Sequence, residues 1–215
     1  MSRCKGSKAD ATRALILDAA ARLFFKFGVN EVSIASIMAE IGMTNGGFYK
    51  YFSSKEMLAA EVCRLSFRKM QGIWEAEAQA VRAGLTAENP YRYLITQYLA
   101  SAEQGRCAIV AFSHDAVGAS PEQVFSQSYR EGTRVLFETL LRVALASVPG
   151  RTKEQVLVDF SAMLGTVLLR RTFGAEQWVQ EIERALLDQC PPVGTPRLRD
   201  RASALKSSIR VAPSK

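Results

Sequence analysis

The stretch SIASIMAEIGMTNGGFYKYFSSK, residues 33–55, predicts two short helices joined by a tight turn. Its first half carries large apolar side chains at the spacing of one helical face, and these are Ile34, Ile37, Met38 and Ile41. Ser33 is a candidate N-cap for this helix, and Gly42 stands where many helices end in a left-handed residue. The pattern therefore predicts a short amphipathic helix that ends in a glycine turn.

A second helix is expected directly after this turn, over residues 45–51, with Thr44 as its cap. Phe48 and Phe52 lie four positions apart and can share a buried face. The polar and aromatic side chains that then point elsewhere are Asn45, Tyr49 and Lys50. A helix, a glycine turn and a second helix with such outward groups are typical of a helix-turn-helix that reads DNA. A helical hairpin that only packs is the alternative.

The glycines of the second helix favour the DNA-reading interpretation. Gly46 and Gly47 would each cost about 1 kcal/mol relative to alanine in a solvated helix. They are useful where the backbone must come close to phosphates. Phenol and ammonium groups that can donate to phosphate oxygens accompany them, from Tyr49, Lys50, Tyr51 and Lys55.

These motifs resemble the N-terminal domain of the tetracycline-repressor (TetR) family of bacterial regulators. The resemblance covers roughly residues 10–65, from the helix that ends in AARLFFKFG through VSIASIMAEIGMTNGGFYKYFSSKEML, with Gly42, Tyr49, Phe52 and Lys55 at matching intervals. Tyr51 departs from the pattern, because many members carry histidine there. The resemblance implies an all-α protein with a three-helix DNA-binding domain. It also implies DNA contacts at Thr44, Asn45, Gly46, Tyr49, Lys50, Tyr51 and Lys55.

The positive charge of the chain gathers at its two ends. Residues 1–55 hold eight Lys/Arg and four Asp/Glu, and residues 191–215 hold six and one, whereas residues 56–190 hold fourteen and sixteen. A basic end favours DNA through counterion release, although solubility alone would also account for a modest excess. Residues 1–9 would form a basic arm that enters the minor groove or stays in solvent.

Several classes of protein are disfavoured by composition. No apolar run approaches the ~18 residues of a membrane span, and the first residues lack the apolar core of a secretory signal, so we expect a cytoplasmic protein with no membrane partner. The four cysteines and the single histidine have no zinc-site spacing. We therefore expect neither a metal nor a cofactor.

The remaining chain reads as further helices separated by turns. We predict a DNA-binding domain over residues 1–55, a helical effector-binding and dimerisation domain over 56–190, and a basic, disordered tail over 191–215. The first helix should run from about Asp10 to Phe27. Its expected inner face comprises Ile16, Ala20, Leu23 and Phe27. Capping boxes are expected at Ser53–Glu56 and Thr152–Gln155.

Two apolar helices near the C-terminus, roughly 153–172 and 175–189, suggest a homodimer. In the resembled family the last two such helices of each subunit build a four-helix bundle. Ala162, Gly165 and Thr166 would let helices approach closely. An internal core is the alternative interpretation.

The second domain is rich in aromatic side chains and could hold a small-molecule effector in a mostly apolar cavity. The expected lining residues are Trp74, Tyr98, Cys107, Phe112, His114, Phe125, Tyr129 and Met163. Ordinary core packing is the alternative for each of them. Without a cavity, the protein would be an architectural DNA binder with no effector.

Cys107 is a candidate sensor within this domain. It stands at a helix start after Gly105–Arg106, where a guanidinium and the helix terminus would lower a thiol pKa. The segment GRCAIVAFSHDAV also resembles a branch of the family in which some members sense electrophiles through such a cysteine. A buried small hydrophobe is the alternative. A Cys–His enzyme is disfavoured, because Cys107 and His114 would lie about 10.5 Å apart along one helix.

Together these features predict a ligand-responsive repressor. It would bind a palindromic double-stranded DNA operator as a homodimer and release it when a small apolar or electrophilic effector binds.

Overall fold

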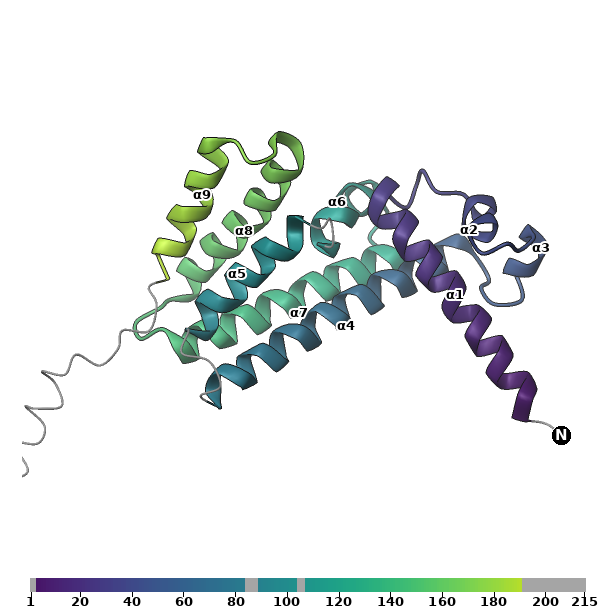
Figure 1. The fold of residues 1–215 in the computed structure, drawn as a ribbon, viewed down its shortest axis with the longest axis horizontal. Coiled ribbons are helices and arrows are strands. Elements are labelled where there is room, and N and C mark those ends of the chain that lie inside the picture. The colour runs from purple at the N-terminus through teal and green to yellow at the C-terminus, as the bar shows by residue number, and fades with distance from the viewer. Residues whose placement is uncertain (1–2, 84–88, 104–106, 191–215) are drawn as a thin grey trace, which may run out of the picture.

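The computed structural model describes residues 3–83, 89–103 and 107–190, and within these ranges the chain consists of helices joined by turns and loops, with no strand (Figure 1). The helices are α1 Arg3–Phe27, α2 Ile34–Glu40, α3 Asn45–Phe48, α4 Lys55–Arg82, α5 Pro90–Glu103, α6 Ala108–Gly118, α7 Val124–Ser147, α8 Lys153–Phe173 and α9 Gln177–Asp188. The predicted all-α class, a helix-turn-helix followed by a helical domain, is confirmed.

The molecule is elongated, and α1–α3, which we call the reading head, form one end of it (Figure 1). Helices α8 and α9 pack together at the other end, and α4 lies along α7 between the two. Because α4 begins beside the reading head and runs into the helical domain, it is the continuous connection between them. In the described ranges, no helix combines the length and apolarity that a bilayer crossing requires.

The predicted inner face of α1 is confirmed at Ile16 and Ala20 and is wrong at Phe27. Its buried residues are Ile16, Ala19, Ala20 and Phe24. Leu23 is only partly buried, and 52% of Phe27 is exposed. The helix also begins at Arg3 rather than near Asp10. The basic arm predicted for residues 1–9 is therefore wrong from residue 3 onward, because those residues continue α1.

Two of the predicted helix starts had different outcomes. The Thr152–Gln155 box is confirmed, since each side chain accepts a hydrogen bond from the other residue's backbone N–H, at 3.3 and 3.0 Å. The Ser53–Glu56 box is wrong. Ser54 accepts the bond from the Met57 N–H, and the Glu56 carboxylate instead accepts from the Val124 N–H at the start of α7, 2.9 Å away.

The contact between α4 and α7 depends on a glycine. A Cβ added to Gly132 on α7 would lie 2.3 Å from the ring of Phe67 on α4, far inside contact distance. Phe67 is itself buried and packs edge-on against Tyr129, with ring centroids 6.0 Å apart. The missing side chain therefore allows the two longest helices of the second domain to approach each other at this point.

The C-terminal end of α9 is attached to the body by two arginines. Arg92 on α5 donates to the carbonyls of Leu187 and Cys190, and Arg151 donates to the carbonyl of Gln189. Arg151 also pairs with Asp159, which accepts a 2.6 Å hydrogen bond from Tyr91. The predicted disorder of 191–215 lies outside the described residues.

Candidate nucleic-acid interface and ligand-binding core

The helix-turn-helix is built by local capping and a small apolar core. Ser33 and Ser36 form a capping box at the start of α2, with the Ser36 N–H donating to the Ser33 hydroxyl over 3.0 Å. Gly42 adopts φ +68°, the left-handed conformation that a helix end requires here. Met43 N–H then bonds to the Met38 carbonyl at 2.8 Å, which turns the chain into α3.

Helix α3 is shorter than predicted, ending at Phe48 rather than Tyr51. Phe48 is fully buried and stacks on Phe52, with centroids 5.7 Å apart. The guanidinium of Arg13 lies 4.7 Å from the Phe52 ring and pairs with Glu61 on α4. These contacts fasten α3 to α1 and α4, so that its outer surface is held on a rigid support.

Most of the predicted DNA-contact residues lie together on the outer surface of α3 and its flanks. Five of them are exposed: Thr44, Asn45, Gly46, Tyr49 and Lys50. Tyr51 is partly buried against the core. Thr44 has the backbone conformation of a cap, but its hydroxyl makes no capping hydrogen bond to α3 in the described structure. That hydroxyl therefore stays available to a partner.

The two glycines of α3 have different structural roles. A Cβ on Gly47 would lie 3.2 Å from the Met43 methyl group, so Gly47 is packed tightly against the core. A Cβ on Gly46 would meet nothing within 4 Å, and Gly46 has no positive φ. Neither packing nor backbone conformation in the free protein requires a glycine at position 46. Close approach of an external partner would.

Lys55 stands at the start of α4, where it faces the turn that follows α1. Its ammonium donates to the Asn30 carbonyl over 3.1 Å. An ammonium has three protons, so this bond leaves others for a phosphate oxygen.

The predicted effector residues gather in the buried part of the second domain, with one exception. Trp74 packs edge-on against Tyr98, whose hydroxyl lies 2.8 Å from the Cys107 sulfur. Phe112 packs against Phe125, with ring centroids 6.1 Å apart. Tyr129 donates to the Ile109 carbonyl, and Met163 is fully buried on α8. His114 is the exception, since its side chain is exposed on α6.

The expected reactivity of Cys107 is not supported by its environment. Its sulfur caps α6 by accepting from the Val110 N–H, which by itself lowers the thiol pKa. The side chain is only 1% exposed, however, and this burial outweighs the hydrogen bonds and raises the pKa. The thiol is therefore protonated at neutral pH, and Arg106 lies outside the described residues.

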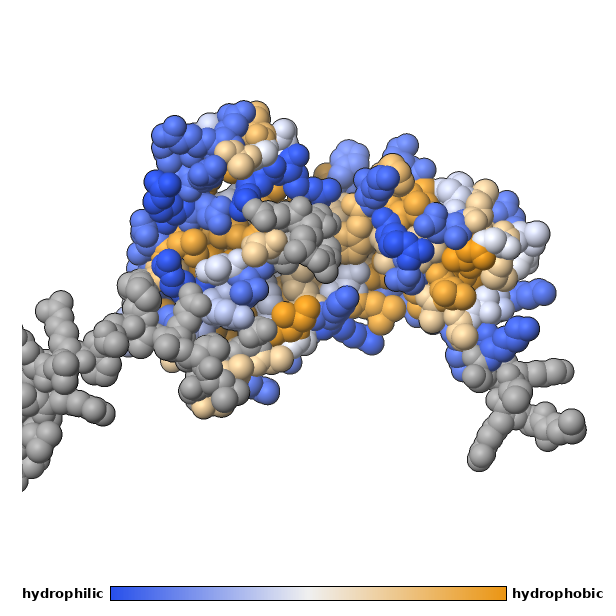
Figure 2. Space-filling view, viewed as in Figure 1, coloured by the Kyte–Doolittle hydropathy of each residue, from blue (hydrophilic) through white to orange (hydrophobic). Residues whose placement is uncertain are grey.

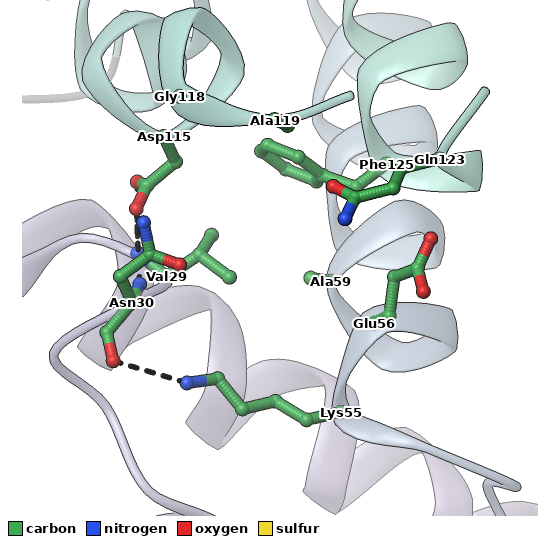
Figure 3. Close-up of a pocket in the computed structure, with 10 residues that line it drawn as sticks. All are labelled: Val29, Asn30, Lys55, Glu56, Ala59, Asp115, Gly118, Ala119, Gln123 and Phe125. Atoms are coloured by element: carbon green, nitrogen blue, oxygen red, sulfur yellow. Dashed lines mark hydrogen bonds between the residues drawn. The ribbon is translucent and has the colours of Figure 1, made fainter. Parts of the chain in front are cut away.

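A pocket at the junction of the two domains, lined by both polar and apolar residues, was not predicted. Its volume is about 330 Å³. Figure 3 shows Val29 and Asn30 from the turn after α1, Lys55, Glu56 and Ala59 from α4, Asp115, Gly118 and Ala119 from the end of α6 and the loop after it, and Gln123 and Phe125 beside the start of α7. Of the predicted effector residues, Phe125 lines this pocket.

Asp115 is the most distinctive residue of the junction. Although it is only 5% exposed, its two carboxylate oxygens each accept a 2.9 Å hydrogen bond, from the backbone N–H groups of Val29 and Asn30. The sequence contains no local signal for this contact, because the partners are more than 80 positions apart.

Comparison with known proteins agrees with this geometry. The family described as "Bacterial regulatory proteins, tetR family" matches residues 16–62, which include α2, α3 and the start of α4. The HTH-type transcriptional regulator AcrR of Shigella flexneri is 39% identical over 80 residues. That match spans 37% of this chain and 37% of the length of AcrR, so it covers little more than a third of either protein.

Solved structures extend the similarity in fold to most of the chain. A TetR transcriptional regulator from Legionella pneumophila has a TM-score of 0.67 at 21% identity, covering 82% of this chain and 95% of its own. The reduced form of NemR from E. coli has a TM-score of 0.64 at 18% identity, covering 81% and 95%. The N-terminal segment of the chain thus matches the family described as bacterial regulatory proteins of the tetR family, and the described fold is similar to that of the solved regulators over most of the chain.

Proposed function

We propose that this protein is a homodimeric transcriptional repressor that binds a palindromic operator and releases it when a small apolar molecule enters its helical domain. Residues 1–55 would bind DNA, and residues 56–190 would bind the effector and form the dimer. The observation that carries the proposal is Gly46: on the exposed surface of α3, it is a glycine that the free protein does not require.

The contacts to DNA would be divided between base reading and phosphate binding. Asn45 is exposed at the start of α3, and its carboxamide can pair with two atoms of an adenine edge. Tyr49 is 65% exposed and could donate to a phosphate, as could Lys50. Lys55 could hold a further phosphate with the ammonium protons that do not bond to Asn30.

The test is to select duplexes from a random DNA pool with the wild-type protein and measure affinity for the best one. Lys55→Ala should weaken binding to all sequences alike and reduce the salt slope by about one. Asn45→Ala should instead weaken the selected duplex more than a scrambled one. Failure of the wild type to enrich any sequence, or an enriched sequence without two-fold symmetry, would refute the proposed operator.

A dimer is supported by the apolar surface of α8. Leu157, Val158 and Leu168 are exposed there, and a Cβ added to Gly165 would meet nothing within 4 Å. Residues 157, 161, 165 and 168 recur at helical spacing and so share one face. The outer edge of the α9 end is hydrophilic in Figure 2, whereas the exposed leucines of α8 offer an apolar face that a second copy would cover.

The dimer is tested by Leu168→Glu, which places a charge on this face. Sedimentation should show a dimer for the wild type and a monomer for the variant. Leu145→Glu, at a similarly exposed position on α7, should remain dimeric. A wild-type monomer at micromolar concentration would overturn this part of the proposal.

The effector we favour is apolar and binds non-covalently. The Tyr98–Cys107 contact is buried beside the ring of Trp74, and burial keeps the Cys107 thiol protonated. N-ethylmaleimide should therefore release DNA equally from wild type and from Cys107→Ser, or from neither. Release from the wild type alone would identify Cys107 as an electrophile sensor. It would contradict the proposal that the effector binds non-covalently.

A further inference from the structure

We propose that Asp115 is the positioning residue that couples the reading head to the helical domain. Its carboxylate holds the turn Gly28–Asn30, which directly follows α1, and thereby sets the orientation of the head relative to α6. The proposal rests on the proposed function only in that the orientation of the head is read out as affinity for DNA.

The contact is bidentate and specific to main-chain donors. Each oxygen of Asp115 accepts one backbone N–H, from Val29 and from Asn30, at 2.9 Å (Figure 3). Hydrogen bonds to an ionised acceptor are roughly twice as strong as neutral ones, and two parallel bonds also fix an angle. A single residue of the helical domain thus constrains the position and the direction of the turn.

The turn is shaped to receive this carboxylate. Gly28 adopts φ +87°, and a Cβ there would lie 3.3 Å from an oxygen of Asp115. A side chain at position 28 would therefore strain the backbone and crowd the acceptor at once. The glycine ends α1 and also lets α6 approach the turn closely.

The charge of Asp115 is stabilised by its two N–H donors against the unfavourable helix dipoles around it. Asp115 lies in the last turn of α6, and its partners follow the last turn of α1, so the negative ends of two helix dipoles lie near its charge. The favourable groups that contact the carboxylate are the two N–H donors, and the adjoining pocket is lined by one cation, Lys55, and one further anion, Glu56. If α6 moves away from the turn, the carboxylate loses both donors at once and keeps the unfavourable dipole of its own helix. The contact should therefore be either fully formed or broken.

Helix α6 also reaches the buried aromatic core at its other end. It starts at Cys107, which contacts Tyr98, and Phe112 in its middle packs against Phe25 on α1 and Phe125 on α7. An effector that displaces Tyr98 or Cys107 would shift α6 along or across the turn that Asp115 holds. A displacement of α6 would therefore be transmitted to the reading head through Asp115. This connection would act in addition to the continuous helix α4.

The test is Asp115→Asn, which keeps the shape of the side chain but replaces one acceptor oxygen by an amide donor. Hydrogen exchange at the Val29 and Asn30 amides should accelerate on the order of tenfold, while the interiors of α2 and α4 stay protected. Affinity for the duplex selected by the wild type should fall severalfold, because a mobile head is less often in the binding orientation. Gly28→Ala should weaken DNA binding in the same way without altering the carboxylate.

The control is His114→Ala, which removes an exposed neighbour on the same helix and should change neither measurement. Unchanged exchange at Val29 and Asn30 in Asp115→Asn would overturn the contact. Faster exchange with full DNA affinity would overturn its positioning role. General acceleration across α1–α6 would mean that Asp115 only stabilises the fold. If the wild type selects no DNA, the proposed function fails, and the exchange result still decides the contact.

Discussion

At the scale of single residues, a substitution at Gly46 should affect folding stability and DNA binding in opposite directions. Gly46→Ala should leave the fold intact and raise the free energy of unfolding by up to about 1 kcal/mol, because alanine is the better helix former. It should nevertheless lower DNA affinity, because the added methyl group stands on the surface that would face the phosphates. Thermal melting and fluorescence anisotropy on the selected duplex measure the two effects.

The matched control for Gly46 is Gly72, an equally open glycine in the interior of α4. Gly72→Ala should give the same gain in stability with unchanged DNA binding. Equal DNA affinity for the Gly46→Ala and Gly72→Ala proteins would show that position 46 does not touch DNA.

Arg151 illustrates the opposite case, a charged residue whose role lies within the fold. Its side chain is 8% exposed and its partner Asp159 only 1%. Removing one member of a buried pair leaves the other charge uncompensated, at a cost of about 3–5 kcal/mol. Arg151→Met should therefore lower the free energy of unfolding by about that amount in urea denaturation. Arg134→Met, which breaks an exposed pair with Glu131 and Glu138 on α7, should change it little.

At the scale of helices, Gly132 sets the separation of α4 and α7. Gly132→Ala would place a methyl group where the Phe67 ring lies, and forcing extra atoms into a packed contact costs about 1–3 kcal/mol. The melting temperature should fall accordingly. Phe67→Leu in the same chain should recover part of the loss, since a smaller side chain makes room. Strictly additive effects in this double-mutant cycle would mean that the two residues do not meet.

Helix positions were largely predictable because their signals are local. The Thr152–Gln155 box and the turn at Gly42 follow from neighbouring residues, and both were predicted from the sequence. Glu56 was misread because its partner is the Val124 N–H, 68 positions away. The face of α1 was misread at Phe27 because burial depends on which helix covers it. Asp115 was missed for the same reason as Glu56, since a carboxylate that binds a distant turn resembles any other in sequence.

At the scale of the whole molecule, the buried thiols and phenols should make the protein sensitive to alkali. Burial raises the pKa of Cys63 to about 12 and that of Tyr129 to about 12, and it also raises the pKa of Cys107. In the unfolded chain these thiols lose their protons near pH 8.5 and the phenol near pH 10, each about its ordinary pKa. Above those values the unfolded state binds fewer protons, so the free energy of unfolding falls as pH rises.

This stabilisation should be fully present below about pH 8 and be lost between about pH 8.5 and 12. Each group contributes a slope of up to about 1.4 kcal/mol per pH unit. Urea denaturation at pH 7.5 and pH 10 measures the difference. Cys63→Ala should lower the stability at pH 7.5 yet make it depend less on pH. A free energy of unfolding that stays constant up to pH 10 would contradict the assignment.

The close contact of Phe67 with Gly132 could also act as a pivot that enlarges displacements along α4. Phe67 lies about 10.5 Å along the helix axis from Trp74 and about 18 Å from Lys55, at 1.5 Å per residue. If α4 is a stiff rod with its fulcrum at that contact, a sideways step at Trp74 reappears at Lys55 in the opposite direction, enlarged about 1.7-fold by the ratio of the two arms. A ligand that displaces the Trp74 indole would thus displace the N-terminal end of α4, at Lys55, by nearly twice the distance. Moving the glycine to another position on α7 would change the ratio of the two distances. The response of DNA binding to the effector should change with it.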